Sequence, residues 1–331
     1  KFTLEVDLQN NKIASLDIPS GLMFVGAFNN PWKFVFDAVI LLGFGVAIVP
    51  AFKMKYWNMG ANSQVLVGCL AACVCMFYLS IYTELPSIVI MLIMFVSSLI
   101  ASTIWAVIPA IFKALFNTNE TLFTLMTNYI AGALVGYINF IMAGGNQDNP
   151  GIINLLTEKG WMPLVLDEYF IPIIIIIIIS AFVYFYINKS VHGFEISVLG
   201  DSRNTAKYAN MNVKLITIRT LVVSGIICGI IGFLYASAID HSVSASTGGS
   251  LGFTGVLVAW LSNFNPIIML GVSAILSFIT NGSSKISSTY HLSANNLSSV
   301  ITGIVFFSLL IAEFIIRYRV LFRKRNKVKR G

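Results

Sequence analysis

Long uninterrupted apolar runs, separated by short polar stretches, dominate the chain. Two examples are Ser87–Ile108 and Ile171–Ile187, and the second contains seven consecutive isoleucines. A helix of about 20 apolar residues crosses the ~30 Å hydrocarbon core of a bilayer. Lipid cannot satisfy backbone polar groups, so a span is either a helix or part of a closed barrel, whose strands alternate apolar and polar residues. The continuous runs exclude the barrel and predict an all-α polytopic membrane protein.

These runs predict nine membrane spans. The seventh and eighth are short, and they meet at "SNFNP", where Pro266 cannot continue the preceding helix. We interpret them as a tight pair of short helices, a form that lines pathways near the middle of the membrane in transporters. The alternative is one kinked span. The predicted spans are 37–53, 63–82, 86–108, 121–141, 170–188, 216–237, 250–262, 266–280 and 298–318.

Composition supports this class. Hydrophobic residues make up 57% of the 331 residues and charged residues 11%, with a mean hydropathy of +0.83, which is far from the balance of a soluble domain. Four cysteines lie within apolar runs, where a cysteine acts as a small hydrophobic side chain rather than a redox or metal-binding group. They are Cys69, Cys73, Cys75 and Cys228.

Basic residues predict the orientation, because they concentrate on the cytoplasmic side. Placing the run Arg323–Arg330 inside puts 16 of the 21 Lys and Arg in the cytoplasm and ten of the 14 acids outside or at the outer edge. Three parts follow: an external N-terminal segment (1–36), a transmembrane domain (37–318) and a basic cytoplasmic tail (319–331). The first residue is Lys1 rather than Met, and we expect one further span before it, which gives ten.

The net charge of +7 is explained by this topology and by the anionic inner leaflet, so we expect membrane lipids as partners and no nucleic acid. Ionisable residues at membrane depth are almost absent. Glu313 precedes Arg317 by one turn near the inner end of the last span, a spacing that favours an ion pair.

Nothing in the sequence indicates an enzyme or a cofactor bound by this chain. "NGSSK" (Asn281–Lys285) lacks the spacing and the preceding strand of a phosphate-binding loop. No catalytic triad is visible, and the three histidines lie apart in loops without metal-ligand spacing. Either a partner supplies the energy, or the protein is a passive channel. The histidines are His192, His241 and His291.

A polar segment, Gly193–Val213, interrupts the apolar runs on the predicted cytoplasmic side, and we call it the coupling segment. Asp201 or Ser202 is suited to cap a helix, and Asn210 tolerates the left-handed conformation that ends one. Ala206 and Ala209 form one small-residue face. The pattern predicts a short helix that docks in a groove of another protein, with a solvated connecting loop as the alternative.

Four motifs resemble, in order, those of permease subunits of bacterial ABC importers for nucleosides and simple sugars, within the branched-chain amino acid and ribose permease family. "GDSRNTAKYANMNV" (Gly200–Val213) is similar to G-E-N-P-x-A-A-x-Y-A-G-I-N-V. "YWNMGANSQ" (Tyr56–Gln64) is similar to F-N-I-G-x-E-G-Q, and "TNETLFTLMTNYIA" (Thr118–Ala131) to V-N-E-x-I-x-T-x-M-x-N-Y-I-A. "GFTGVLVAWLSNFNP" (Gly252–Pro266) is similar to G-F-x-G-I-A-V-A-L-L-G-x-x-N-P.

The resemblance implies the fold of an ABC importer permease in the bacterial cytoplasmic membrane, for which the basic residues predict a cytoplasmic C-terminus. It implies a second homologous permease subunit, for which we expect a heterodimer rather than a homodimer. It also implies a cytoplasmic ATPase subunit that binds Mg-ATP and an external substrate-binding lipoprotein. The implied cargo is a nucleoside, with purine nucleosides first.

Other functions remain open. The same type of permease for a simple sugar such as ribose is the nearest alternative. A second alternative, from another class, is an ion-coupled carrier or passive channel, and a third is a membrane scaffold that works through its basic tail.

The resemblance also indicates two sets of residues. In the coupling segment, Ser202 and Arg203 replace the family's Asn-Pro; near the pathway, Asn62 and Ser63 replace Glu-Gly and remove a charge. Uncharged amides suit a neutral solute, and aromatic rings can stack on a base, although amides also join helices in membranes. Contact with the ATPase is expected from Asp201, Ser202, Arg203, Asn204, Lys207, Tyr208, Asn210 and Asn212. Pathway candidates are Asn58, Asn62, Gln64, Asn128, Tyr129, Phe253 and Trp260.

Overall fold

The computed structural model describes residues 3–7, 12–17, 28, 30–145, 151–249 and 251–289, with scattered residues between 300 and 315. The chain divides into two compact units. One comprises Lys1–Asn29 and Phe278–Gly331, and the other Asn30–Ser277. In the first unit, β1 (Thr3–Asp7) and β2 (Lys12–Asp17) pair as an antiparallel hairpin. Sequence analysis did not predict strands in this segment.

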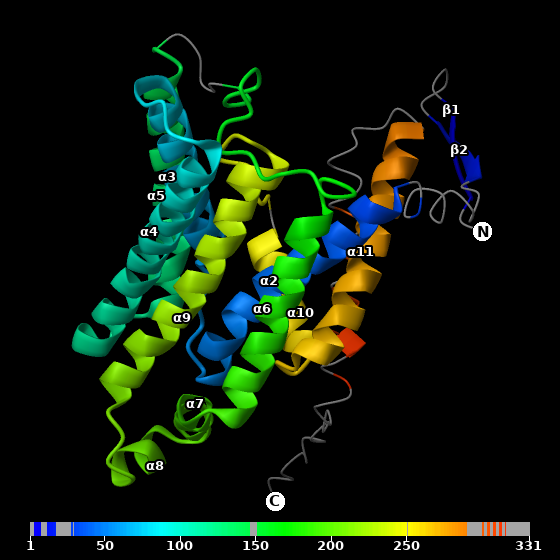
Figure 1. Cartoon of the computed structure of the whole chain (residues 1–331). Coiled ribbons are helices and arrows are strands. Elements are labelled where there is room, and N and C mark those ends of the chain that lie inside the picture. Colours follow the sequence, from blue (N-terminus) through cyan, green and yellow to red (C-terminus); the bar gives the residue numbers. More distant parts are fainter. Residues whose placement is uncertain are drawn as a thin grey trace, which may run out of the picture. The chain divides into compact units, whose positions relative to one another are not determined.

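Helices make up the second unit (Figure 1). Seven helices of the described residues are long and apolar enough to cross a membrane. The helices are α2 (Pro31–Lys53), α3 (Ala61–Tyr82), α4 (Ser87–Phe116), α5 (Glu120–Met142), α6 (Phe170–Lys189), α7 (Val191–Asp201), α8 (Arg203–Tyr208), α9 (Val213–Leu234), which continues into the π-helix η1 (Tyr235–Ile239), α10 (Leu251–Leu261) and α11 (Pro266–Thr289), whose first part belongs to this unit.

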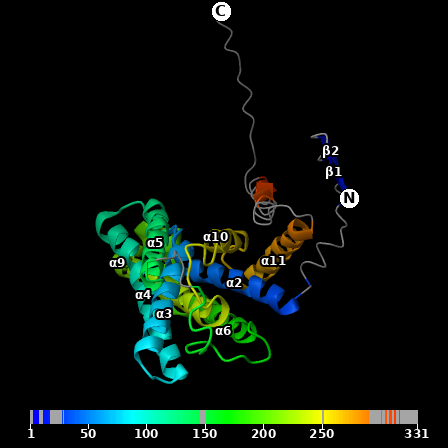
Figure 2. The ribbon, with the colours of Figure 1, turned by 90° about the horizontal axis from the view of Figure 1, so that it is seen from above.

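Helix α2 lies at the centre of this unit and is buried along most of its length. Seen from above, α3, α4, α5 and α9 lie to one side of it, whereas α6 and α10 flank it on opposite sides (Figure 2). Because α2 is apolar on all sides, it can be surrounded in this way, whereas an amphipathic helix must keep one face at the surface. Its first turn is set by the Asn30 side chain, which accepts a hydrogen bond from the Lys33 N–H at 3.2 Å, and by Pro31.

Helices α3, α4 and α9 form a close-packed block. A side chain at Gly229 of α9 would place its Cβ 2.9 Å from the Leu99 Cα of α4. The hydroxyl of Ser98 donates to the Gly229 carbonyl at 2.7 Å, and that of Ser102 donates to the Gly225 carbonyl at 2.9 Å. Small residues and interhelical hydroxyl bonds are the means by which membrane helices approach closely. We call these contacts the glycine–serine seam.

The predicted spans agree with the observed helices in type, but several boundaries differ. The first begins at Pro31 rather than at 37, because Asn30 caps it. Helix α4 continues past the predicted end at 108, through Pro109, and stops at Asn117, whose φ is 52°. The eighth span is not short, because α11 continues to Thr289. The ninth, 298–318, lies outside the continuously described residues.

The junction at "SNFNP" separates two helices, as predicted. Helix α10 is short, with 11 residues, and ends at Leu261, and α11 begins at Pro266. Asn263 and Phe264 between them have φ values of 47° and 60°. Two successive left-handed residues reverse the chain direction, so this is a turn between two helices rather than a kink in one.

Candidate functional site

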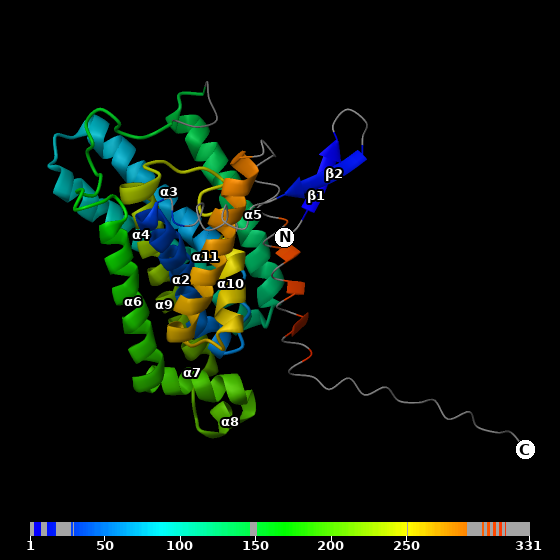
Figure 3. The same cartoon turned by 90° about the vertical axis from the view of Figure 1, so that its right-hand side faces the viewer.

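The coupling segment folds as two helices at one end of the second unit (Figure 3). Helix α7 ends at Asp201, and the Ser202 hydroxyl then caps α8 by accepting a hydrogen bond from the Thr205 N–H at 3.3 Å. Asn210 is left-handed, with a φ of 56°. The predicted capping by Ser202 and termination at Asn210 are therefore confirmed. The prediction of a single helix was wrong, because extended backbone at Ser202 breaks it, and Asp201 belongs to α7.

One face of α8 is buried, and the opposite face is exposed. Ala206 is completely buried, but Ala209 is exposed at the end of the helix, so the predicted face shared by the two alanines does not exist. Tyr208 is 92% exposed, and Arg203, Asn204 and Lys207 are exposed beside it. Asn212 caps α9 by accepting from the Leu215 N–H at 3.2 Å. Ala206 packs in a buried cluster with Ala51, Met54, Tyr56, Ala110, Ile196, Leu199, Ile216 and Leu221.

The elbow between α7 and α8 lies on the end of α2. A Cβ at Gly200 would lie 2.1 Å from the Lys53 carbonyl oxygen, so a glycine is needed for this approach. The backbone of α7 therefore contacts the backbone of α2 directly. Movement of α7 is expected to reach α2 and the loop that follows it without any flexible side chain between them.

The four candidate pathway amides lie close together. We call them the amide cluster: Asn58, Asn62, Gln64 and Asn128. The Asn58 Oδ1 accepts from the Gly60 N–H at 3.0 Å and from the Gln64 Nε2 at 3.3 Å. Asn128 of α5 accepts from the Ser63 N–H at 3.1 Å and donates to the Met59 carbonyl at 2.9 Å. These contacts fasten α5 to the loop and first turn that begin α3.

The amide cluster lies well inside the unit. Asn128 lies two turns after Glu120, the first residue of α5, so it is about 12 Å further along the helix axis at 1.5 Å per residue. Next to Asn62 lie the glycines before and within α10: a Cβ at Gly252 would be 2.7 Å from the Asn62 Cβ, and one at Gly248 would be 3.2 Å from its Oδ1. The chain thus returns inward after α2, and α3 begins deep in the protein.

Some polar atoms of the amide cluster have no hydrogen-bond partner in the described structure. They are the Asn58 Nδ2, the Asn62 Oδ1 and the Gln64 Oε1. Asn58 and Gln64 are almost completely buried. A buried polar atom without a partner is costly unless a ligand satisfies it. The cluster therefore offers both donors and acceptors to a neutral solute.

The three aromatic candidates are not part of this cluster. Tyr129 is 82% exposed, because it is turned about 100° around α5 from its neighbour Asn128. Phe253 is also exposed, and Trp260 is half-buried. Sequence analysis chose these rings by residue type, but helical rotation turns Tyr129 away from Asn128.

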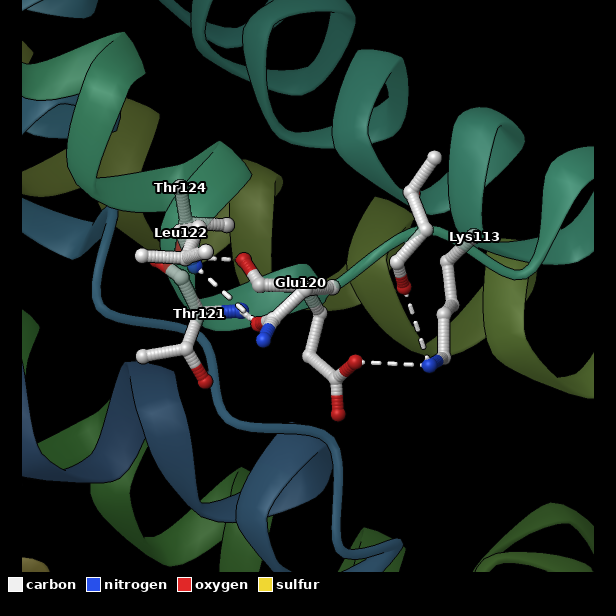
Figure 4. Close-up of polar contacts among 7 residues, drawn as sticks. Lys113, Glu120, Thr121, Leu122 and Thr124 are labelled. Atoms are coloured by element: carbon white, nitrogen blue, oxygen red, sulfur yellow. Dashed lines mark hydrogen bonds and ion pairs between the residues drawn. The ribbon is translucent and has the colours of Figure 1, made fainter.

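An ion pair between α4 and α5 was missed in the sequence. The Lys113 Nζ lies 2.7 Å from the Glu120 Oε2 and donates to the Thr118 carbonyl at 3.0 Å (Figure 4). Asn119 caps α5 by accepting from the N–H groups of Thr121 and Leu122 at 3.1 and 3.2 Å. A signal was present, because an Asn-Glu pair opening an apolar run is typical of a helix start.

This ion pair lines a cavity of 270 Å³ beside the elbow, which we call the elbow cavity. Burial, and then the charge of Glu120, raise the pKa of Tyr56 above its usual range, so its hydroxyl stays protonated. That hydroxyl is buried and has no hydrogen-bond partner in the described structure. The cavity is lined by Met54, Lys55, Tyr56, Lys113, Glu120, Leu199, Gly200, Asp201, Arg203 and Thr217.

Two histidines have definite surroundings. His192 was expected in a loop but lies in α7, where its Nδ1 is hydrogen-bonded to the Tyr186 hydroxyl. At the other end, the His241 ring stacks on Trp161 at 3.8 Å between centroids. Burial lowers the pKa of His241, opposed by a hydrogen bond with the Ala236 backbone and by the charges of Glu168 and Glu158. Among the described residues, no three acids, histidines or cysteines are grouped to hold a metal ion; His291 lies outside them.

Comparison with known proteins places the chain among transport components. The family described as "branched-chain amino acid transport system / permease component" matches residues 32–310. A guanosine ABC transporter permease protein of Bacillus subtilis is 23% identical over 285 residues, covering 81% of each chain. A nucleoside ABC transporter permease protein of Lactococcus lactis is 26% identical over 246 residues, covering 70% of this chain and 66% of the relative.

Two further similarities extend over most of the chain. A glucose ABC transporter permease protein of Haloferax volcanii is 23% identical over 316 residues, covering 91% of this chain and 82% of the relative. A solved structure, of a metal-chelate type ABC transporter in an inward-facing conformation, superimposes with a TM-score of 0.53 at 14% identity. It covers 90% of this chain and 92% of the other, and it shows the similarity of the fold.

Proposed function

The chain belongs to the family of permease components of branched-chain amino acid transport systems, and we propose that it is the membrane subunit of an ABC importer that carries nucleosides, with purine nucleosides as the first candidates. In this proposal the energy comes from ATP hydrolysis in a separate cytoplasmic subunit. The permease supplies the pathway and the surface through which the ATPase acts.

The observation that carries the proposal is the exposed face of α8. The motif-bearing segment forms a short capped helix that presents Arg203, Lys207 and Tyr208 at one end of the unit. Its opposite face is fixed through Ala206 to a buried cluster that includes Tyr56 and Ala110. A helix that is exposed on one side and firmly packed on the other is suited to transmit force from a partner.

The nature of the cargo is supported by two independent features. The amide cluster carries unpaired donors and acceptors but no charge, which suits a neutral hydrogen-bonding solute. The relatives from Bacillus subtilis and Lactococcus lactis are named for guanosine and for nucleosides. A simple sugar is the second candidate, favoured by the relative named for glucose.

The proposed assembly contains a second permease subunit, of a related rather than identical sequence, together with the ATPase and an external substrate-binding lipoprotein. The chain lies in the bacterial cytoplasmic membrane with the coupling segment and the C-terminal tail in the cytoplasm. The concentration of basic residues on that side supports this orientation.

Uptake into liposomes tests the proposal. The liposomes hold the permease, its partner and the ATPase, with ATP trapped inside, and labelled guanosine and binding protein are added outside. We expect ATP-dependent uptake that excess adenosine blocks and excess ribose does not. Uptake that is indifferent to ATP but sensitive to an ionophore would support the ion-coupled carrier instead. If guanosine is not taken up but the ATPase still responds to ribose, the protein is an ABC importer permease for a sugar rather than for a nucleoside.

A further inference from the structure

The Lys113–Glu120 ion pair connects the end of α4 to the start of α5. Only 18% of the Lys113 side chain and 15% of the Glu120 side chain are exposed. A largely shielded pair is held more firmly than a surface pair, because solvent and salt screen it less. Each charge also complements its helix, since the cation lies in the last turn of α4 and the anion in the first turn of α5.

Glu120 begins a polar stripe along α5. Residues four apart lie on the same face of a helix, so Glu120, Thr124 and Asn128 form one line. The Thr124 hydroxyl donates to the Glu120 carbonyl at 2.8 Å and accepts from the Met59 N–H at 3.1 Å. Asn128, one turn further, belongs to the amide cluster. A displacement of Glu120 along the helix axis therefore reaches the amide cluster through one rigid helix.

The other end of the stripe faces the coupling segment. Glu120 and Lys113 line the same elbow cavity as Asp201 and Arg203. Tyr56 lines it too, and it packs in one buried cluster with Ala206 of α8. The ion pair is thus next to the part of the chain that is proposed to move with the ATPase, and Arg203 is a second cation in the lining of the cavity.

We propose that the Lys113–Glu120 pair is the positioning pair that makes α5 follow the coupling segment, so that ATP-driven movement at α8 changes the geometry of the amide cluster. This inference rests on the proposed function, because it needs a motor at α8, but it does not depend on which solute is carried. Coupling between sites requires an element that both sites bias. In this proposal α5 is that element, because the pair ties it to α4, whose Ala110 packs in one buried cluster with Ala206 of α8.

Transport efficiency tests the pair. In the liposome assembly, Glu120→Gln and Lys113→Gln are expected to keep binding-protein-stimulated ATP turnover close to wild type while solute carried per ATP falls by about tenfold. Exchange of the charges, Lys113→Glu with Glu120→Lys, is expected to recover part of the loss, because it restores the pair but places each charge at the unfavourable end of its helix. A purely structural role would lower ATP turnover and uptake together.

Lys214→Gln is the matched control. Lys214 is an exposed lysine in the first turn of α9 and does not line the elbow cavity. We expect this variant to transport as wild type does. The inference is overturned if Lys214→Gln loses as much solute per ATP as Glu120→Gln does, or if Glu120→Gln loses none.

A second measurement needs no solute. Spin labels at Leu122 and Val191, which are exposed on α5 and α7, report the distance between these helices in the full assembly. On ATP binding we expect one narrow distribution in the wild type, because the helices move together, and a broad one in Glu120→Gln. Identical distributions in the two proteins would refute the pair's role. If the two distributions differ as expected but the assembly takes up no nucleoside, the role of the pair is supported and the proposed nucleoside cargo is refuted.

Discussion

Gly200 lies directly against the carbonyl oxygen of Lys53, which places the end of α7 on the end of α2. A Cβ at this position would be 2.1 Å from that oxygen, and backbone atoms cannot move aside as a flexible side chain can. The contact is therefore a rigid seat for the coupling segment.

We predict that Gly200→Ala displaces α7 and destabilises the protein by about 2 kcal/mol, within the range for inserting a methyl group into a well-packed site. The measurement is thermal unfolding of the purified protein in detergent. Gly132→Ala in α5 is the control, because no atom lies within 4 Å of the position its Cβ would take. Alanine there should be neutral or stabilising by up to about 1 kcal/mol. Equal losses of stability in both variants would show that the close contact between Gly200 and the Lys53 carbonyl is not what makes alanine unfavourable at position 200.

Asn62 and Asn128 should respond differently to replacement by alanine. Asn128 makes two hydrogen bonds with the start of α3, so its loss is expected to lower stability by about 1–3 kcal/mol. The Asn62 Oδ1 has no partner in the described structure, so Asn62→Ala should raise the solute concentration needed for half-maximal uptake with little effect on unfolding. Thermal unfolding and uptake measured on both variants separate the roles. If Asn62→Ala only destabilises, Asn62 joins helices and does not contact the solute.

Charge reversal on α8 should weaken coupling to the ATPase. Arg203→Glu with Lys207→Glu changes two exposed side chains, so the free energy of unfolding should stay within about 0.5 kcal/mol. Substrate-stimulated ATP turnover is expected to fall by about tenfold, as when charged partners at an interface are made to repel. Lys214→Glu, on the same side in α9, is the control. Unchanged turnover in the double variant would count against α8 as the contact.

His241 should make stability sensitive to acid. Burial lowers its pKa in the folded protein, so below the ordinary imidazole value of about 6.5 the unfolded chain binds the proton more readily. Stability should therefore be complete above that value and fall as the pH is lowered through it. The thermal midpoint is expected to drop between about pH 7.5 and about pH 5.5, and to drop less in His241→Asn.

Asparagine suits this position because His241 has a φ of 47°. The comparison is of pH dependence, since loss of the Trp161 stack changes absolute stability. Burial raises the pKa of neighbouring Asp240, which acts with the opposite sign, because the folded protein then binds the proton more readily as the pH falls. An identical pH dependence in the wild type and His241→Asn would exclude His241 as the sensitive group.

The sequence predicted those features that depend on local chemistry. Long apolar runs were enough to identify the helical membrane class, and Ser202, Asn210 and Pro266 marked real helix boundaries. Each of these signals acts within a few residues. The ends of some helices were harder to predict. Helix α4 continues through Pro109, and α11 continues through a polar stretch.

Features that depend on distant parts of the chain were not predictable in this way. The inward return of residues 54–60 is held by Thr124 and Asn128, which lie far along the chain on another helix. The elbow at Ser202 depends on the seat of Gly200 on α2. The amides were chosen as candidates through the resemblance to a family, which did not predict that they lie together or that the Tyr129 ring is exposed.

The glycine–serine seam has a consequence for how the protein is made. Ser98 and its acceptor Gly229 are 131 residues apart, so ribosomes deliver α4 to the membrane well before α9 exists. During that interval the hydroxyls of Ser98 and Ser102 lack their acceptors on α9 and have only α4 itself, the neighbouring α3 or lipid as surroundings. Synthesis therefore passes through a stage in which the α3–α4 hairpin is in the membrane but its hydroxyls have not yet found their acceptors on α9.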